Sequence, residues 1–136
     1  MTPVVRARAD ASPAADAISF KGYVANARDA LHNIDVLVVP SKFDGRPNTV
    51  MEANACGVPV IAAPVGGIPE LIEDGVNGHL AFPGDTERIV ALVRCWLQDP
   101  ARFAALRRSA RMKAERDFDR HRMIDEYAAA LAPTSS

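Results

Sequence analysis

One segment of the sequence has the residue types of an anion site, because a glycine and a proline come just before a helical pattern. It reads Gly45-Arg46-Pro47-Asn48-Thr49. Proline suits the first position of a helix, where its missing N–H would be unsatisfied in any case. The free amides of such a first turn, helped by the helix dipole, suit the binding of phosphate. A junction of this kind is more often only a turn, so the segment alone leaves both interpretations open.

Two carboxylates frame this junction. Asp44 lies in the loop, and Glu52 shares a helix face with Asn48 and Thr49 at i, i+3 and i+4 spacing. On a helix that starts at a phosphate site, a carboxylate can accept two hydrogen bonds from ribose hydroxyls. The neighbours of Glu52 along the helix are apolar, so we expect a mostly buried side chain that needs a partner. The alternative is a solvent-exposed Glu52 with no ligand.

The elements that must position these residues alternate between strands and helices. β-branched runs predict strands over residues 18–24, 35–40, 58–63 and 79–82, and helical patterns fall at 26–32, 47–56 and 68–73. Such alternation is typical of βαβ units, so we expect an α/β fold with a Rossmann-like parallel sheet flanked by helices. The run 35–40 is apolar on both faces, which predicts a central strand.

The chain becomes purely helical from Asp85, whose side chain suits an N-cap. A helical stripe follows, made of Ile89, Leu92, Val93, Trp96 and Leu97. Further helices are predicted near 100–116 and 120–131, and the arginines of the first, Arg107, Arg108 and Arg111, are interpreted as a solvated face. Residues 1–17 are expected to form a flexible leader and residues 133–136 a disordered tail.

Composition excludes several classes of function. Sixteen basic and 17 acidic residues give a net charge of −1, which argues against a nucleic-acid partner. No apolar run approaches the roughly 18 residues that span a bilayer, and no signal peptide is recognised, so we expect a cytoplasmic protein without a membrane span. The two cysteines lack metal-site spacing and the three histidines are scattered, so neither a metal site nor a histidine base is predicted.

Longer motifs resemble one family. Asp44-Gly-Arg-Pro-Asn-Thr-Val-Met-Glu52 is followed by a Gly-Val-Pro-Val run at 57–60, by Gly66-Gly-Ile-Pro-Glu70 and by Asp74-Gly-Val-Asn-Gly78. This series resembles the donor-binding half of the retaining GT-B glycosyltransferases of family 4, or "group 1", which carry two glutamates separated by seven residues at the first motif. The resemblance covers roughly residues 18–131, and it implies that 18–132 is a partial nucleotide-sugar-binding domain.

The resemblance implies a role for each matching residue. Glu52 would hold the ribose of a nucleotide-diphosphate sugar, and Asp44, in place of the first glutamate, would lie near the anomeric centre as the catalytic carboxylate. The backbone of the segment 45–49 would contact the sugar and the diphosphate. Main-chain atoms of Tyr23 and Val24 would help to seat the base. The donor is a substrate, and the family's reaction needs no metal or other cofactor.

The sequence departs from the family pattern at two residues, and parts of the family's structure are not found in it. Asp44 is one methylene shorter than glutamate, and Arg46 stands where the family has an apolar or aromatic residue. The family's basic diphosphate motif and its N-terminal acceptor-binding domain are not found in residues 1–17. We therefore expect a chain that transfers no hexosyl group alone and that needs the missing domain or a partner chain.

Two other interpretations use the same residues differently. In the first, the chain is a non-catalytic module that associates with a partner chain through exposed C-terminal helices, with Met123, Tyr127 and Leu131 as the apolar contacts. In the second, Asp44 and Glu52 are the paired carboxylates of a glycosidase. A nucleotide-type α/β sheet is a poor setting for the second.

Overall fold

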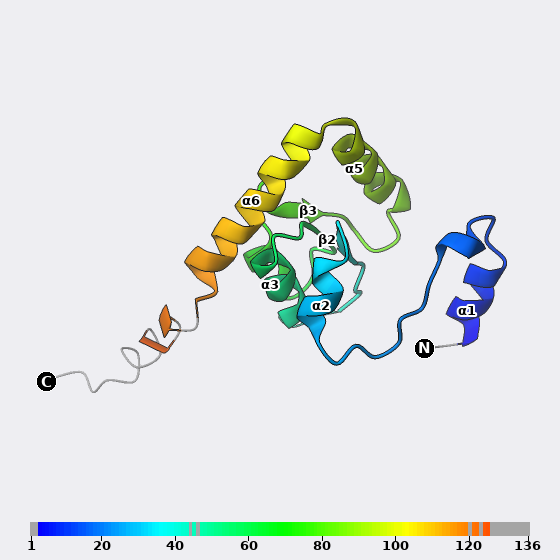
Figure 1. Ribbon diagram of the computed structural model, residues 1–136, viewed down its shortest axis with the longest axis horizontal. Helices are drawn as coiled ribbons and strands as arrows, with labels where there is room; N and C mark the ends of the chain where they lie inside the picture. The colour runs from blue at the N-terminus through cyan, green and yellow to red at the C-terminus, as the bar shows by residue number, and fades with distance from the viewer. Residues whose placement is uncertain (1–2, 44, 46, 120, 123, 126–136) are drawn as a thin grey trace, which may run out of the picture.

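The computed structural model describes residues 3–43, 45, 47–119, 121–122 and 124–125. Its elements in chain order are α1 (Pro3–Asp10), a 3₁₀ turn η1 (Ala15–Ala17), α2 (Ala27–His32), β1 (Leu37–Val39), α3 (Asn48–Ala55), β2 (Val60–Ala62), α4 (Ile68–Leu71), β3 (Gly78–Leu80), α5 (Thr86–Gln98) and α6 (Pro100–Asp117). Figure 1 shows α2, α3, α5 and α6 around the short strands, with α1 apart from them. No helix in the described part of the chain combines the length and apolarity that crossing a membrane requires.

The three strands form a parallel sheet in the order β1-β2-β3. β2 is buried along its whole length, and both of its neighbours pair with it in parallel. The expectation of a Rossmann-like α/β sheet is therefore confirmed. The expected central position of 35–40 is wrong, because β1 is an edge strand among the described residues and Val38 is 40% exposed.

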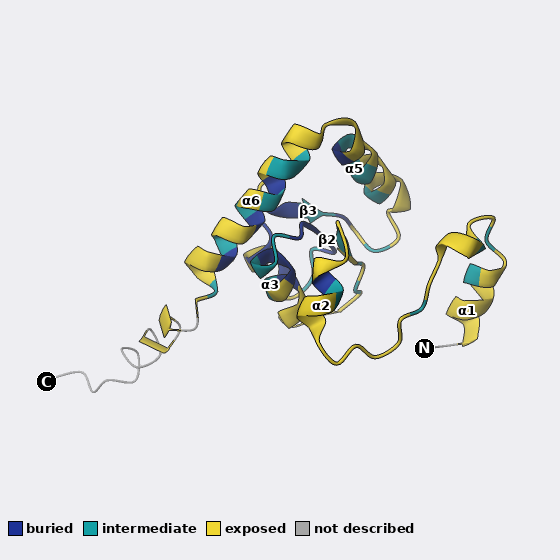
Figure 2. Ribbon diagram, in the orientation of Figure 1, coloured by how far each residue is buried: buried dark blue, intermediate teal, exposed yellow. Residues whose placement is uncertain are grey.

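Side chains of β2 alternate between two apolar cores, one on each face of the sheet. Val60 and Ala62 pack with residues of α2, α3 and α4, whereas Ile61 packs on the opposite face with Trp96 of α5 and Leu106 of α6. Figure 2 shows the buried residues gathered where the strands meet α3 and α6. Helices thus cover both faces, as a parallel sheet requires.

The predicted strand 18–24 is absent. These residues have no regular structure, Tyr23 is 93% exposed, and Gly22 takes a left-handed φ of 65° that interrupts an extended run. A strand needs a neighbour to satisfy its backbone, and no described strand pairs with the outer edge of β1. The expected leader contains α1, none of whose residues is buried, and its flexibility stays a prediction.

The C-terminal helices largely follow the predicted pattern. The Asp85 carboxylate accepts a hydrogen bond from the Arg88 amide at 3.1 Å, which confirms the N-cap. Trp96 is buried, but Leu97 is 76% exposed and does not belong to the stripe. One residue along a helix is a rotation of about 100°, which turns Leu97 away from the core. The predicted helix 120–131 lies mostly outside the described residues.

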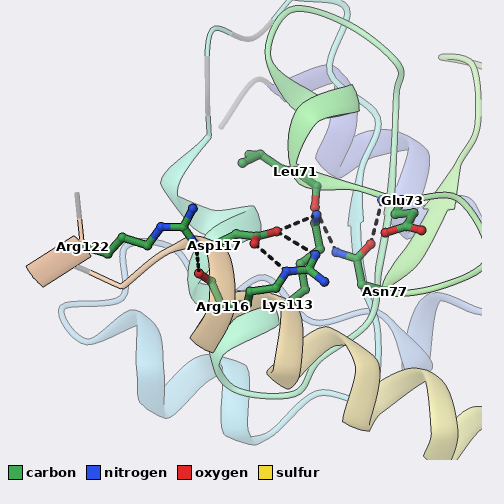
Figure 3. A network of polar contacts seen from close by, with 7 residues as sticks. All are labelled: Leu71, Glu73, Asn77, Lys113, Arg116, Asp117 and Arg122. Atoms are coloured by element: carbon green, nitrogen blue, oxygen red, sulfur yellow. Dashed lines mark hydrogen bonds and ion pairs between the residues drawn. The ribbon is translucent and has the colours of Figure 1, made fainter. Parts of the chain in front are cut away.

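The turn before β3 is held by a buried asparagine. The Asn77 amide accepts a hydrogen bond from the Glu73 N–H at 2.7 Å and donates one to the Leu71 carbonyl at 2.9 Å (Figure 3). These two hydrogen bonds take the place of hydrogen bonds to water, which polar groups lose when the fold buries them. The Asp-Gly-Val-Asn-Gly motif at 74–78 therefore has a structural role, which is to place β3 beside β2.

Asp74 fixes the other side of this turn. Its carboxylate accepts a hydrogen bond from the Leu80 N–H at 2.8 Å and lies 3.1 Å from Nδ1 of His79. Burial raises the pKa of Asp74, but the Leu80 N–H, His79 and the charge of Arg88 at 3.7 Å together outweigh burial, so the pKa is lowered overall. The His79 ring in turn stacks on Trp96 with 5.6 Å between centroids, which joins the turn to the second core.

Protonation of Asp117 is expected to destabilise the fold. The Arg116 side chain, hydrogen-bonded at 2.7 Å, and Lys113, at 3.0 Å, hold the pKa of Asp117 far below its usual range (Figure 3). A carboxyl with a depressed pKa stabilises the fold above its unfolded-state pKa of about 3.9, and this stabilisation is lost as the pH falls. Urea unfolding between pH 5 and pH 2 should show a drop in stability that is smaller in Asp117→Asn.

The control for this prediction is Asp16→Asn, which removes an exposed carboxylate with no side-chain partner among the described residues. Its pH profile should follow that of the wild type. An Asp117→Asn profile as steep as the wild-type profile would show that other carboxyls cause the acid sensitivity.

Candidate functional site

A cavity of about 630 Å³ lies between α2 and α3, within the size range of small-molecule sites. Its walls are the start of α2 (25–28), Leu31, His32, Glu52, the end of α3 with its cap (55–57) and Arg111 of α6. The start of α2 is fixed locally, because the side-chain oxygen Oδ1 of Asn26 accepts a hydrogen bond from the Arg28 backbone N–H at 3.1 Å. The cavity therefore has one wall that its own sequence specifies.

Glu52 is the only carboxylate that lines this cavity among the described residues. The side chain is exposed, so the expectation of a mostly buried glutamate is wrong. Val50, Ala53 and Asn54 occupy the buried face of α3, and Glu52 lies on the other side of the helix. Within the described chain its carboxylate has neither a hydrogen bond nor an ion pair, so it is free to meet a ligand.

The first turn of α3 lies outside the cavity walls. Pro47 occupies the N-cap position of α3, and no side chain caps the helix. The first backbone amides of α3 therefore donate to no capping side chain. Asn48 and Thr49 are exposed, and they share with Glu52 the helix face that the sequence indicated. The cavity instead continues from Glu52 toward the C-terminal end of α3.

The loops after β1 and β2 meet beside this helix. The Gly67 N–H donates a hydrogen bond to the Gly45 carbonyl, which joins the two segments that the sequence singled out for their glycines. Gly66, next to the donor, has a left-handed φ of 55°. The carboxyl ends of neighbouring parallel strands thus bring the two loops together, where ligands of open α/β sheets bind.

Other predicted site residues are not brought to the cavity. Tyr23 and Val24 are exposed and precede its wall, which begins at Ala25. Asp44 and Arg46 lie outside the described residues, so their roles stay predictions. No group of three or more histidine, cysteine or acidic side chains in the described ranges is arranged to hold a metal ion.

Several cavity residues were missed by sequence reasoning, and His32 and Arg111 are two of them. His32 ends α2 and Arg111 comes from α6, yet both line the same space as Glu52. No local signal marks either residue, because each reaches the cavity through packing of helices distant in sequence. The solvated face predicted for Arg107 and Arg111 is wrong in part, since both side chains hydrogen-bond to backbone carbonyls at the end of α3.

A parallel sheet covered by helices on both faces, with a ligand-sized cavity beside it, places the chain among Rossmann-like α/β domains. Comparison with known proteins specifies the family. The sequence profile of the family "Glycosyl transferases group 1" matches residues 2–99. The chain belongs to the group 1 glycosyltransferases.

Two relatives illustrate the similarity. A D-inositol 3-phosphate glycosyltransferase of Catenulispora acidiphila is 41% identical over 75 residues, 55% of this chain and 18% of the relative. The amylovoran biosynthesis glycosyltransferase AmsK of Erwinia amylovora is 36% identical over 107 residues, 74% of this chain and 26% of the relative. The chain thus spans about a fifth to a quarter of the length of these two relatives.

Solved structures show the same arrangement. Anabaena HepE in complex with UDP matches with a TM-score of 0.79 and 28% identity, over 86% of this chain and 33% of HepE. HepE has also been solved with UDP-glucose, and that structure gives a TM-score of 0.73. The C-terminal domain of LpcC from Francisella tularensis, at 23% identity and a TM-score of 0.66, shares the fold over 74% of this chain and 53% of that domain.

Proposed function

We propose that this chain forms the nucleoside-binding part of a retaining group 1 glycosyltransferase, and that it binds a nucleotide-diphosphate sugar. The observation that carries the proposal is the free carboxylate of Glu52 in the wall of a 630 Å³ cavity. An ionised carboxylate accepts strong hydrogen bonds from a ribose diol. Binding of UDP and UDP-glucose by HepE supports a nucleotide-diphosphate sugar as the ligand.

The diphosphate is assigned to the first turn of α3. Glu52 lies one helical turn from Asn48, a spacing of about 5–6 Å between Cβ atoms. A nucleotide whose ribose contacts Glu52 therefore reaches the first-turn amides with its phosphates, and α3 is long enough to contribute a helix dipole. The same amides would stabilise the negative charge that develops on the leaving diphosphate during transfer.

Transfer itself is assigned to a larger assembly. A retaining transfer breaks the bond between the anomeric carbon and the diphosphate oxygen and forms a bond to an acceptor hydroxyl on the same face, with Asp44 near the anomeric centre. The reaction needs a site that excludes water and aligns the acceptor. Glu52 is exposed to solvent here, so we propose that the 136 residues alone bind the nucleotide weakly and do not transfer sugar.

Replacing Glu52 by alanine is expected to weaken UDP binding by about tenfold or more, because the ribose hydroxyls lose a charged hydrogen-bond acceptor. Isothermal titration calorimetry of the full chain with UDP measures this directly. Glu52→Gln, which keeps one carbonyl oxygen but no charge, should lie between the wild type and Glu52→Ala.

Glu87→Ala is the matched control, since Glu87 is an exposed glutamate on α5 outside the cavity. It should bind UDP as the wild type does. Equal affinities for the wild type and Glu52→Ala would remove Glu52 from the site.

A further inference from the structure

The C-terminal end of α3 is closed by arginines from α6, a helix that lies across it (Figure 1). Arg107 donates a hydrogen bond from Nε to the Gly57 carbonyl at 3.1 Å, and Arg111 donates one from Nη1 to the Ala55 carbonyl. Ala55 ends α3, and the last carbonyls of a helix have no partner within the helix; cations are favoured at this end of its dipole. Gly57 lies two residues beyond the helix. The two guanidinium groups therefore fix the end of α3 in place.

Both arginines are themselves oriented by other side chains. Arg111 donates from Nε to the Glu115 carboxylate at 2.7 Å. The Arg107 guanidinium lies 3.7 Å from the Asp35 carboxylate and 5.9 Å from the Phe103 ring centroid. Planar guanidinium groups that are held from two sides present their remaining N–H donors in a fixed direction. Arg111 is thus held by a residue of its own helix, and Arg107 also reaches Asp35, which lies just before β1.

The two helices also approach each other closely. Ala110 and Ala114 of α6 are buried, and small side chains at such positions let helix backbones come near one another. Gly57 has a left-handed φ of 67°, and a Cβ atom built on it would lie 3.5 Å from the Arg107 carbonyl oxygen. The segment that follows α3 therefore lies beside α6, at a distance that would leave an added Cβ in ordinary van der Waals contact.

The clamped residues are part of the cavity wall. Residues 55–57 and Arg111 line the same cavity as Glu52, which lies one turn earlier on α3. A shift of α3 along its axis would move the Glu52 carboxylate relative to the wall formed by α2. We propose that Arg107 and Arg111 are positioning residues, which set where Glu52 meets the ribose; this inference rests on the function proposed above.

The test compares UDP with 2′,3′-dideoxy-UDP, which lacks the ribose hydroxyls that Glu52 is proposed to bind. The wild-type chain should prefer UDP by about tenfold or more. In Arg111→Ala the preference should fall to about twofold or less, because a displaced Glu52 no longer distinguishes the two ligands. General loss of structure would instead weaken both ligands equally and leave the preference intact. Arg111→Lys, which keeps a cation able to donate to the Ala55 carbonyl, should recover part of the preference.

Arg108→Ala is the control, because Arg108 is an exposed arginine of α6 with no partner among the described residues. Its preference should equal that of the wild type. If Arg111→Ala does not fold, the preference for UDP over 2′,3′-dideoxy-UDP is measured in Arg107→Ala and Arg111→Lys instead. Variants at both positions that keep the full preference overturn the inference alone. A wild-type chain that binds both nucleotides equally overturns the proposed function, and this inference with it.

Discussion

Replacing Gly78 by alanine is expected to lower the free energy of unfolding by about 3 kcal/mol, the upper part of the range for overpacked cores. A Cβ atom at this position would lie 2.3 Å from the Val60 carbonyl oxygen and 3.2 Å from the Val60 carbon and nitrogen. All three are backbone atoms of the central strand, so they cannot rotate away. Urea unfolding followed by circular dichroism measures the loss.

The position of Gly78 in the sheet explains the size of the effect. Gly78 is the register partner of Val60 in the β2–β3 pair, and the Gly75 N–H donates to its carbonyl at 2.8 Å. Relief of the clash would separate β3 from β2 or open this turn. Since a domain is stable by only about 5–15 kcal/mol, such a loss is a large fraction of the total.

Gly45→Ala is the control for this prediction. A Cβ atom there would meet nothing within 4 Å, so the change should alter stability by less than about 0.5 kcal/mol. A Gly78→Ala protein as stable as the Gly45→Ala protein would mean that the strands tolerate a wider spacing than the geometry indicates.

Replacing Asn54 by leucine is expected to raise the free energy of unfolding by about 1–3 kcal/mol, the cost of leaving a buried polar group unpaired. Asn54 is fully buried on α3, and neither its amide nitrogen nor its oxygen has a hydrogen-bond partner in the described part of the chain. Leucine has a similar shape and no polar atoms. Thermal unfolding should show a higher melting temperature, by several degrees.

Asn77→Leu is the matched comparison, and its effect should have the opposite sign. Asn77 is as deeply buried, but its amide makes two hydrogen bonds to the backbone. Leucine would leave the Glu73 N–H and the Leu71 carbonyl without hydrogen-bond partners, which should lower the free energy of unfolding by about 2–4 kcal/mol. A destabilised Asn54→Leu protein would show that the Asn54 amide has a partner after all, such as a water molecule.

Much of the fold was predictable because its signals are local. Asn26 and Asp85 cap helices within three residues of themselves, and Gly57 takes a left-handed φ where α3 ends. The β-branched run around Leu37 and the run around Val60 form strands as expected. Each of these features depends on a few neighbouring residues, so the sequence alone is sufficient to place it.

The remaining features depend on contacts between distant parts of the chain. The apolar content of 35–40 indicates a strand but not its position at the edge of the sheet, because strand order is a tertiary property. The exposure of Glu52 depends on which face of α3 the core covers. The contacts of Arg107 with Gly57 and of Arg111 with Ala55 join residues 50 and 56 positions apart, and no sequence pattern marks them.

The most direct measurement is a crystal structure of this chain grown with UDP. We expect the two ribose hydroxyls within about 3 Å of the Glu52 carboxylate oxygens, with the diphosphate over the first turn of α3. UDP bound away from the cavity, or bound inside it with the ribose turned from Glu52, would contradict the proposed role of this carboxylate.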